Sequence, residues 1–166
     1  MEINIMALNK PLKQGGVVVT TSEIIKALDE MREQESLGVT GRFGLEFALG
    51  CVETMTSPIK FEPSHIVNNL RVKTDRCFGI KFCKTFPWVK FSQLRQTLVG
   101  DLIPLPNAAG VALLQYLSSG RRACASLKAI GNLTSDNELN GIVINAVDLV
   151  IDGHGKERRF WIKGWK

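Results

Sequence analysis

The chain has 166 residues, which is enough for one domain, or one domain with a small extension, and for a core without disulfide bonds. Hydrophobic residues make up 45% and charged residues 22% of the sequence, close to an average soluble protein. The formal net charge is +5, and no apolar run reaches the roughly 20 residues of a membrane-spanning helix, which excludes a membrane-spanning helix as a functional element.

The charge is unevenly distributed along the chain. Residues 1–70 carry six basic and nine acidic side chains, whereas residues 71–166 carry fifteen basic and seven acidic ones. The pattern therefore predicts an acidic α/β extension over 1–70 and a basic part over 71–166, both within one compact unit. A basic part attracts polyanions.

The N-terminal elements are predicted from local patterns. Alternation favours a strand over residues 2–8, and β-branched residues favour a short strand over 17–20. A helix is expected over residues 23–36, capped by Thr21 or Ser22, with an acidic outer side that can contact a protein partner.

In the middle of the chain, residue 64 follows a proline and favours a helix over 64–70. Strands are predicted over 77–84 and 87–91, a helical turn over 94–99 and a proline-bounded loop over 102–106.

The C-terminal third has clearer signals. Asn107 can cap a helix that ends at residue 117, and alternation predicts strands over 121–133 and 142–151. A tight turn at 152–155 then allows residues 158–165 to return as a hairpin partner.

The most informative stretch is residues 71–95, where seven cations stand against one acid and five aromatic rings lie between them. Cations meet phosphates and rings stack on bases, so this mixture is typical of surfaces that bind single-stranded nucleic acid. The candidate binding residues here are Arg71, Lys73, Arg76, Lys81, Lys84, Trp88, Lys90, Phe91 and Arg95. The alternative is a strand pair with its aromatics in the core and its lysines in solvent.

Further candidates lie in the C-terminal half. Two cations follow the helix stop, and the end of the chain alternates cations with tryptophans. The additional candidate binding residues are Arg121, Arg122, Arg158, Arg159, Trp161 and Lys163. Solvated helix-end cations and a partner-subunit interface remain the alternatives for these residues.

Residues 112–151 resemble the second half of OB-fold single-stranded-DNA-binding proteins. The likeness rests on a Tyr-Leu helix end at 116–117 followed by Gly120, on Gly-Asn-Leu at 131–133, and on Ile-Asn-Ala-Val at 144–147. It extends to residues 86–151 if the strand around Trp88 corresponds to that family's third strand. The resemblance implies an α+β fold with an OB-like curved sheet or small barrel in the C-terminal part, and stacking of bases on its aromatics.

No catalytic residue, metal site or cofactor is predicted. The four cysteines form no CxxC pair and read as small buried residues, which fits a reducing cytoplasm. Phosphate-binding loops, dinucleotide fingerprints, zinc-protease motifs and nucleophile elbows are lacking.

Two functions follow from these patterns. The first is non-enzymatic binding of single-stranded DNA or RNA in the cytoplasm. The second is a small interaction or inhibitor protein of viral or mobile-element origin that docks on a partner protein. A homo-oligomer is compatible with both, and no membrane partner is expected.

Overall fold

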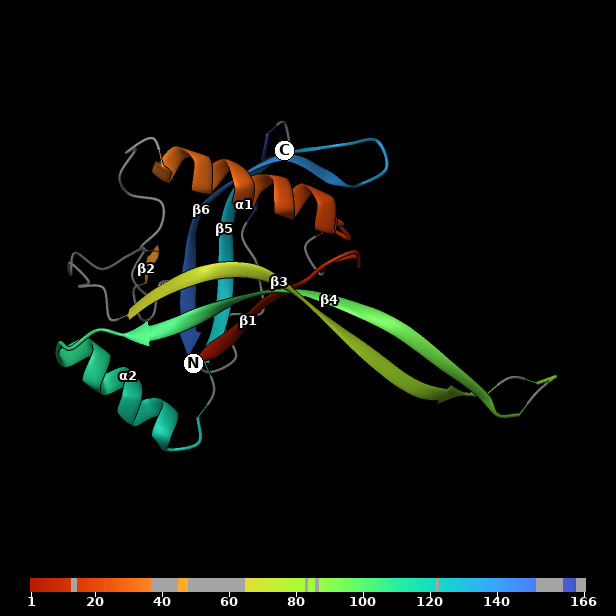
Figure 1. Cartoon of the computed structure of the whole chain (residues 1–166), viewed down its shortest axis with the longest axis horizontal. Coiled ribbons are helices and arrows are strands. Elements are labelled where there is room, and N and C mark those ends of the chain that lie inside the picture. The colour runs from red at the N-terminus through yellow and green to blue at the C-terminus, as the bar shows by residue number, and fades with distance from the viewer. Residues whose placement is uncertain are drawn as a thin grey trace.

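The structure is a computed structural model that describes residues 1–12, 15–36, 45–47, 65–82, 84–85, 87–121, 123–151 and 160–163. Within these residues the chain forms two β-sheets and two helices (Figure 1). The strands are β1 (Glu2–Ala7), β2 (Leu45–Phe47), β3 (His65–Lys81), β4 (Val89–Pro104), β5 (Ala123–Leu133), β6 (Leu139–Ile151) and β7 (Phe160–Lys163), and the helices are α1 (Thr21–Ser36) and α2 (Ala108–Ser118). The expected α+β class, rich in strands and with a curved antiparallel sheet, is confirmed.

The sheets have the strand orders β1-β4-β3-β2 and β6-β5-β7. A hydrophobic core joins them, and α1 lies over it against β6 and β3. Fully buried side chains come from both sheets and from α1, among them Leu98, Leu127, Ile144 and Ile24. Residues before and after position 70 contribute to this one cluster.

Both helices lie close to where the sequence predicts them. The side chain of Asn107 accepts a hydrogen bond from the backbone N–H of Gly110 (2.7 Å), so the predicted cap of α2 is confirmed. At α1 the cap is one residue earlier than predicted, because the Thr20 hydroxyl accepts from the N–H of Glu23 (3.4 Å). A hydroxyl three residues before a free N–H has the usual capping geometry.

Three predictions in the middle of the chain are wrong. The helix expected over 64–70 is the start of β3 in the described residues, the helical turn over 94–99 lies inside β4, and β4 continues through most of the expected 102–106 loop. Pairing between distant segments explains this, because residues 97–101 have β1 on one side and β3 on the other. Ladder hydrogen bonds on both sides outweigh a weak local helical pattern.

Elsewhere the outcome is mixed. Strands 2–8, 121–133 and 142–151 are confirmed as β1, β5 and β6, with shifted ends. The strand over 17–20 is reduced to isolated bridges at Val18. The return of 158–165 as a hairpin partner is wrong for its described residues, since β7 pairs in parallel with β5 and β6 lies on the other side of β5. The turn at 152–155 lies outside the described residues.

A β-bulge determines which side of β3 faces the core. The register with β4 shifts between Asn68 and Arg71, and Asn69 has a φ of 51°. The extra residue moves the core-facing positions from odd to even numbers, from Val67 to Leu70 and Val72. Beyond the bulge, the even-numbered residues of β3 and β4 share the core-side face.

Two leucines on the core-side face of β4 test this arrangement. Leu98 is completely buried and Leu94 is 60% exposed. We expect Leu98→Ala to lower the free energy of unfolding by about 2–5 kcal/mol. The matched change Leu94→Ala should alter it by less than about 0.5 kcal/mol. Urea unfolding followed by circular dichroism measures both, and equal losses would contradict the exposure of residue 94.

Candidate nucleic-acid interface

The outer halves of β3 and β4 leave the body of the protein as a two-stranded arm (Figure 1). Residues 97–101 of β4 lie between β1 and β3, and the backbone carbonyl of Gln96 accepts from the N–H of Leu8 (2.9 Å). Among the described strands, residues 89–95 pair with β3 alone. We define the arm as residues 74–82 and 88–96, and its described tip as residues 84, 85 and 87. Among the described strands, therefore, none pairs with the outer edges of the arm.

The register divides the arm into two faces. In an antiparallel pair, directly opposed residues project to the same side. The face that continues the core side, here called the apolar face, carries Arg76, Phe78, Ile80, Phe82, Trp88, Lys90, Ser92 and Leu94; for residues 82 and 88 we extend the register one step past the last pair of the ladder. The other, here called the opposite face, carries Asp75, Cys77, Gly79, Lys81, Val89, Phe91, Gln93 and Arg95.

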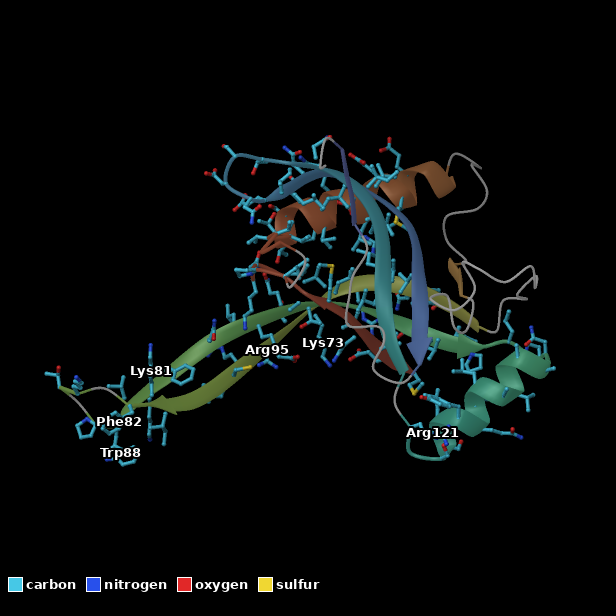
Figure 2. All side chains as sticks on the ribbon, turned by 180° about the vertical axis from the view of Figure 1, so that it is seen from behind. Lys73, Lys81, Phe82, Trp88, Arg95 and Arg121 are labelled. Atoms are coloured by element: carbon cyan, nitrogen blue, oxygen red, sulfur yellow. The ribbon has the colours of Figure 1, made fainter. Side chains whose placement is uncertain are left out.

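Large apolar side chains on the apolar face are strongly exposed. Phe78 and Trp88 are each 75% exposed, and Ile80, Phe82 and Leu94 are 60% exposed or more. Figure 2 shows Phe82 and Trp88 together on one side of the arm's end, with Lys81 on the other side. An exposed apolar patch on a protein surface usually marks a binding site.

The arm is also strongly basic. Between positions 76 and 95 the sequence has five cations and no acid: Arg76, Lys81, Lys84, Lys90 and Arg95. None of these five forms an ion pair with another residue in the part of the chain that the structure describes. Their charge is available to an anionic ligand.

The two cations nearest the body, unlike the five on the arm, form ion pairs within the described part of the protein. Arg71 donates to Glu2 (Nη2–Oε2, 2.7 Å) and to Asp101 (Nη1–Oδ1, 3.1 Å), and Lys73 donates to the second oxygen of Glu2 (Nζ–Oε1, 2.7 Å). These contacts tie the root of the arm to β1. The sequence predicts both residues as phosphate contacts, but their charges are already paired within the protein.

The network changes the pKa values of its members. The hydrogen bond from Lys73 lowers the pKa of Glu2, and in return the hydrogen bond to Glu2 raises the pKa of Lys73. At Asp101 the hydrogen bond from the Asn69 amide (2.9 Å) is the main cause of a lowered pKa, with Arg71 adding to it. The folded state therefore favours both carboxylates in their charged form.

Lowering the pH should weaken this network, because protonation removes the charge of its two carboxylates. A carboxylate with a lowered folded-state pKa stabilises the fold above its ordinary pKa, here 4.5 for Glu2 and 3.8 for Asp101, and the stabilisation is lost as pH falls through the folded value. In a variant with Glu2→Gln and Asp101→Asn, we expect the melting temperature to fall less steeply than in the wild type as the pH is lowered below these two pKa values. Glu30→Gln on α1, outside the network, is the control and should keep the wild-type slope.

On the core side, the root is held by a second set of contacts. The side-chain carbonyl of Gln96 accepts hydrogen bonds from the Asn9 amide (2.9 Å) and from the Thr21 hydroxyl. The side-chain oxygen Oδ1 of Asn9 in turn accepts a hydrogen bond from the backbone N–H of Thr21 (3.0 Å). Both faces of the arm's root are thus anchored to the N-terminal segment.

The opposite face is more closely packed. A Cβ built on Gly79 would lie 2.4 Å from Cζ of Phe91, so the ring of Phe91 covers the backbone of its cross-strand partner. Phe91 is 40% exposed, about half the exposure of Phe78. The phenylalanine predicted as a nucleic-acid contact therefore has a structural contact of its own.

The remaining predicted residues lie outside the arm. Arg121 follows α2, stacks over the ring of Tyr116 at 5.5 Å, and lies on the far side of the body from the arm (Figure 2). Trp161 and Lys163 belong to β7, next to Ile130 and Asn132 of β5. Arg122, Arg158 and Arg159 lie outside the described residues. The structure thus gathers Arg76, Lys81, Lys84, Trp88, Lys90, Phe91 and Arg95 on the arm, and it places Arg121, Trp161 and Lys163 on other elements.

Four large apolar residues of the apolar face were not among the sequence candidates: Phe78, Ile80, Phe82 and Leu94. The alternation of Phe78, Ile80 and Phe82 places them on one face, but the same alternation is equally typical of a buried strand. Only the length of the ladder beyond the body shows that this face is exposed.

Within the described ranges, no helix is long and apolar enough to span a membrane, and no cluster of three or more His, Cys, Asp or Glu side chains is placed to hold a metal ion. Comparison with models of protein families, with curated proteins and with solved structures finds no match.

Proposed function

We propose that the protein binds single-stranded nucleic acid through the apolar face of the arm, as a binding protein and not as an enzyme. The single observation that carries the proposal is one exposed surface with both large apolar side chains and unpaired cations, Arg76 and Lys90, and with no acid. Rings and aliphatic groups stack on bases of any sequence, and cations neutralise the backbone. We therefore expect little sequence preference.

The order of elements supports an OB-like arrangement for this function. A helix, α2, lies between the long β3–β4 hairpin and the β5–β6 hairpin, and Gly120 follows it with a φ of 82°. The first sheet is strongly curved, and β1 packs near β5 (Figure 1). We propose that these strands form an OB-like barrel from which the arm extends.

A protein partner is the competing proposal. The exposed side of α1 is less acidic than the sequence alone indicates, because Lys26 pairs with Glu23 (3.7 Å) and Arg32 with Asp29 (3.3 Å). A partner docking on the arm would have to combine apolar and acidic groups. If the protein binds no oligonucleotide even at low salt, a protein partner is favoured over nucleic acid.

Trp88 tests the role of the arm's end. Because its side chain is 75% exposed, Trp88→Ala should leave the melting temperature unchanged. We expect the change to weaken binding of a fluorescent oligothymidylate by about 1–3 kcal/mol, the contribution of one stacked base. Leu114→Ala, a half-exposed apolar residue of α2, is the control and should bind as wild type. Equal losses at both positions would argue against a site on the arm.

The salt dependence of binding tests the role of the cations. For single strands the slope of log affinity against log salt is about −0.7 for each phosphate neutralised. We expect Lys90→Glu to make the slope less steep by at least that amount. Lys10→Glu, at an exposed position outside the arm, should leave the slope unchanged. The same effect from both changes would mean that overall charge, and not the arm, drives binding.

A further inference from the structure

The apolar face is organised as a ladder of four cross-strand rows. From the body outward these are Arg76 with Leu94, Phe78 with Ser92, Ile80 with Lys90, and Phe82 with Trp88, the last continuing the register just past the final pair of the ladder. Each row has at least one large apolar side chain that is 60% exposed or more. The rows are thus four separate contact points that follow one another along the arm.

The spacing of the rows matches the combined thickness of one side chain and one nucleobase. Successive residues on one face of an antiparallel strand are about 6.8 Å apart, twice the rise per residue. Stacked bases in a duplex are about 3.4 Å apart. One base therefore fits between two successive rows in contact with both, and a second base does not. Four rows have three such gaps.

We propose that the arm takes three consecutive unpaired bases, one in each gap between successive rows, with the sugar–phosphate chain running along the arm. This inference rests on the proposed function and adds the size and conformation of the ligand. Bases that alternate with protein side chains are about twice as far apart as in a duplex, so the ligand is an extended, unstacked single strand. Arg76 in the first row and Lys90 in the third, both on this face, lie near its phosphates.

A second copy of this chain is a poorer occupant of the same face. Two apolar faces packed together would bury four cations, Arg76 and Lys90 of each copy, and neither face has an acid to compensate them. Buried like charges oppose association. A nucleic-acid strand supplies flat apolar groups and negative charge together.

A length series tests the footprint. Oligothymidylates of two, three, four, six and twelve nucleotides are titrated at low salt with the protein carrying Trp161→Phe and Trp165→Phe, so that Trp88 is the sole tryptophan and reports binding by quenching. We expect affinity to rise about 5-fold or more for each added base up to three or four nucleotides, as each base gains a stacking contact. From four to twelve nucleotides it should rise only about tenfold or less, through the number of overlapping positions. If the tryptophan changes lower the melting temperature, a labelled oligonucleotide and wild-type protein give the same series by anisotropy.

Matched variants on the two faces test the gaps. Phe78→Ser removes a side chain that borders two of them and should lower trinucleotide affinity by about tenfold or more. Val89→Ser, 41% exposed on the opposite face, should leave it unchanged. A steep rise in affinity beyond six nucleotides, or equal losses from the two variants, would overturn the three-base footprint while single-strand binding stands.

Absence of binding at every length would overturn the proposed function together with the footprint. Sedimentation of the wild type and of Phe78→Ser tests whether a second copy of the chain occupies the apolar face. If the wild type is a dimer that Phe78→Ser converts to a monomer, a second copy occupies the apolar face, and the footprint is overturned.

Discussion

The β3–β4 ladder is the interaction on which the rest of this structure depends. One half of it lies in the body, where β1 and β2 add further strands, and the other half is a two-stranded arm. A two-stranded ribbon by itself is marginally stable in water. The arm can persist because its hydrogen bonds continue, without a break in the strands, from a segment that has neighbours and a core beneath it. Loss of register in the body would therefore disorganise the arm as well.

The polar contacts at the root reinforce this continuity. Arg71 and Lys73 are bound to Glu2 and Asp101 on one face, and Gln96 is bound to Asn9 and Thr21 on the other. All of these groups are partly exposed, so each contact contributes modestly to stability. Their effect is geometric, since they fix the direction in which the arm leaves the body. They also separate the basic residues into two groups, those paired at the root and those farther out whose charge is available.

The exposed apolar face is unfavourable in water unless a ligand covers it. Five large side chains project from the face that, closer to the body, forms the hydrophobic core. The same side of the sheet therefore begins as core at Leu98 and Val72 and ends as a surface at Phe82 and Trp88. Burying that surface against bases would recover the hydrophobic free energy, and the cations beside it would offset the charge of the backbone. The arm has the residue pattern of a core strand, but no other element in the described part of the chain covers it.

The sequence by itself determined the elements whose stability is local. The periodicity and caps of α1 and α2, and the alternation in β5 and β6, placed these elements to within a few residues, and the basic, aromatic composition of 71–95 pointed to the region of the arm. Tertiary structure alone decided that residues 65–70 and 94–99 are strands, because their hydrogen-bond partners are distant in sequence. It also decided, through the bulge at Asn69, which residues of β3 lie on the same face as Trp88. That this face is exposed was likewise decided by the tertiary structure. Alternation shows which residues share a face, but only the neighbouring strands determine whether that face is core or surface.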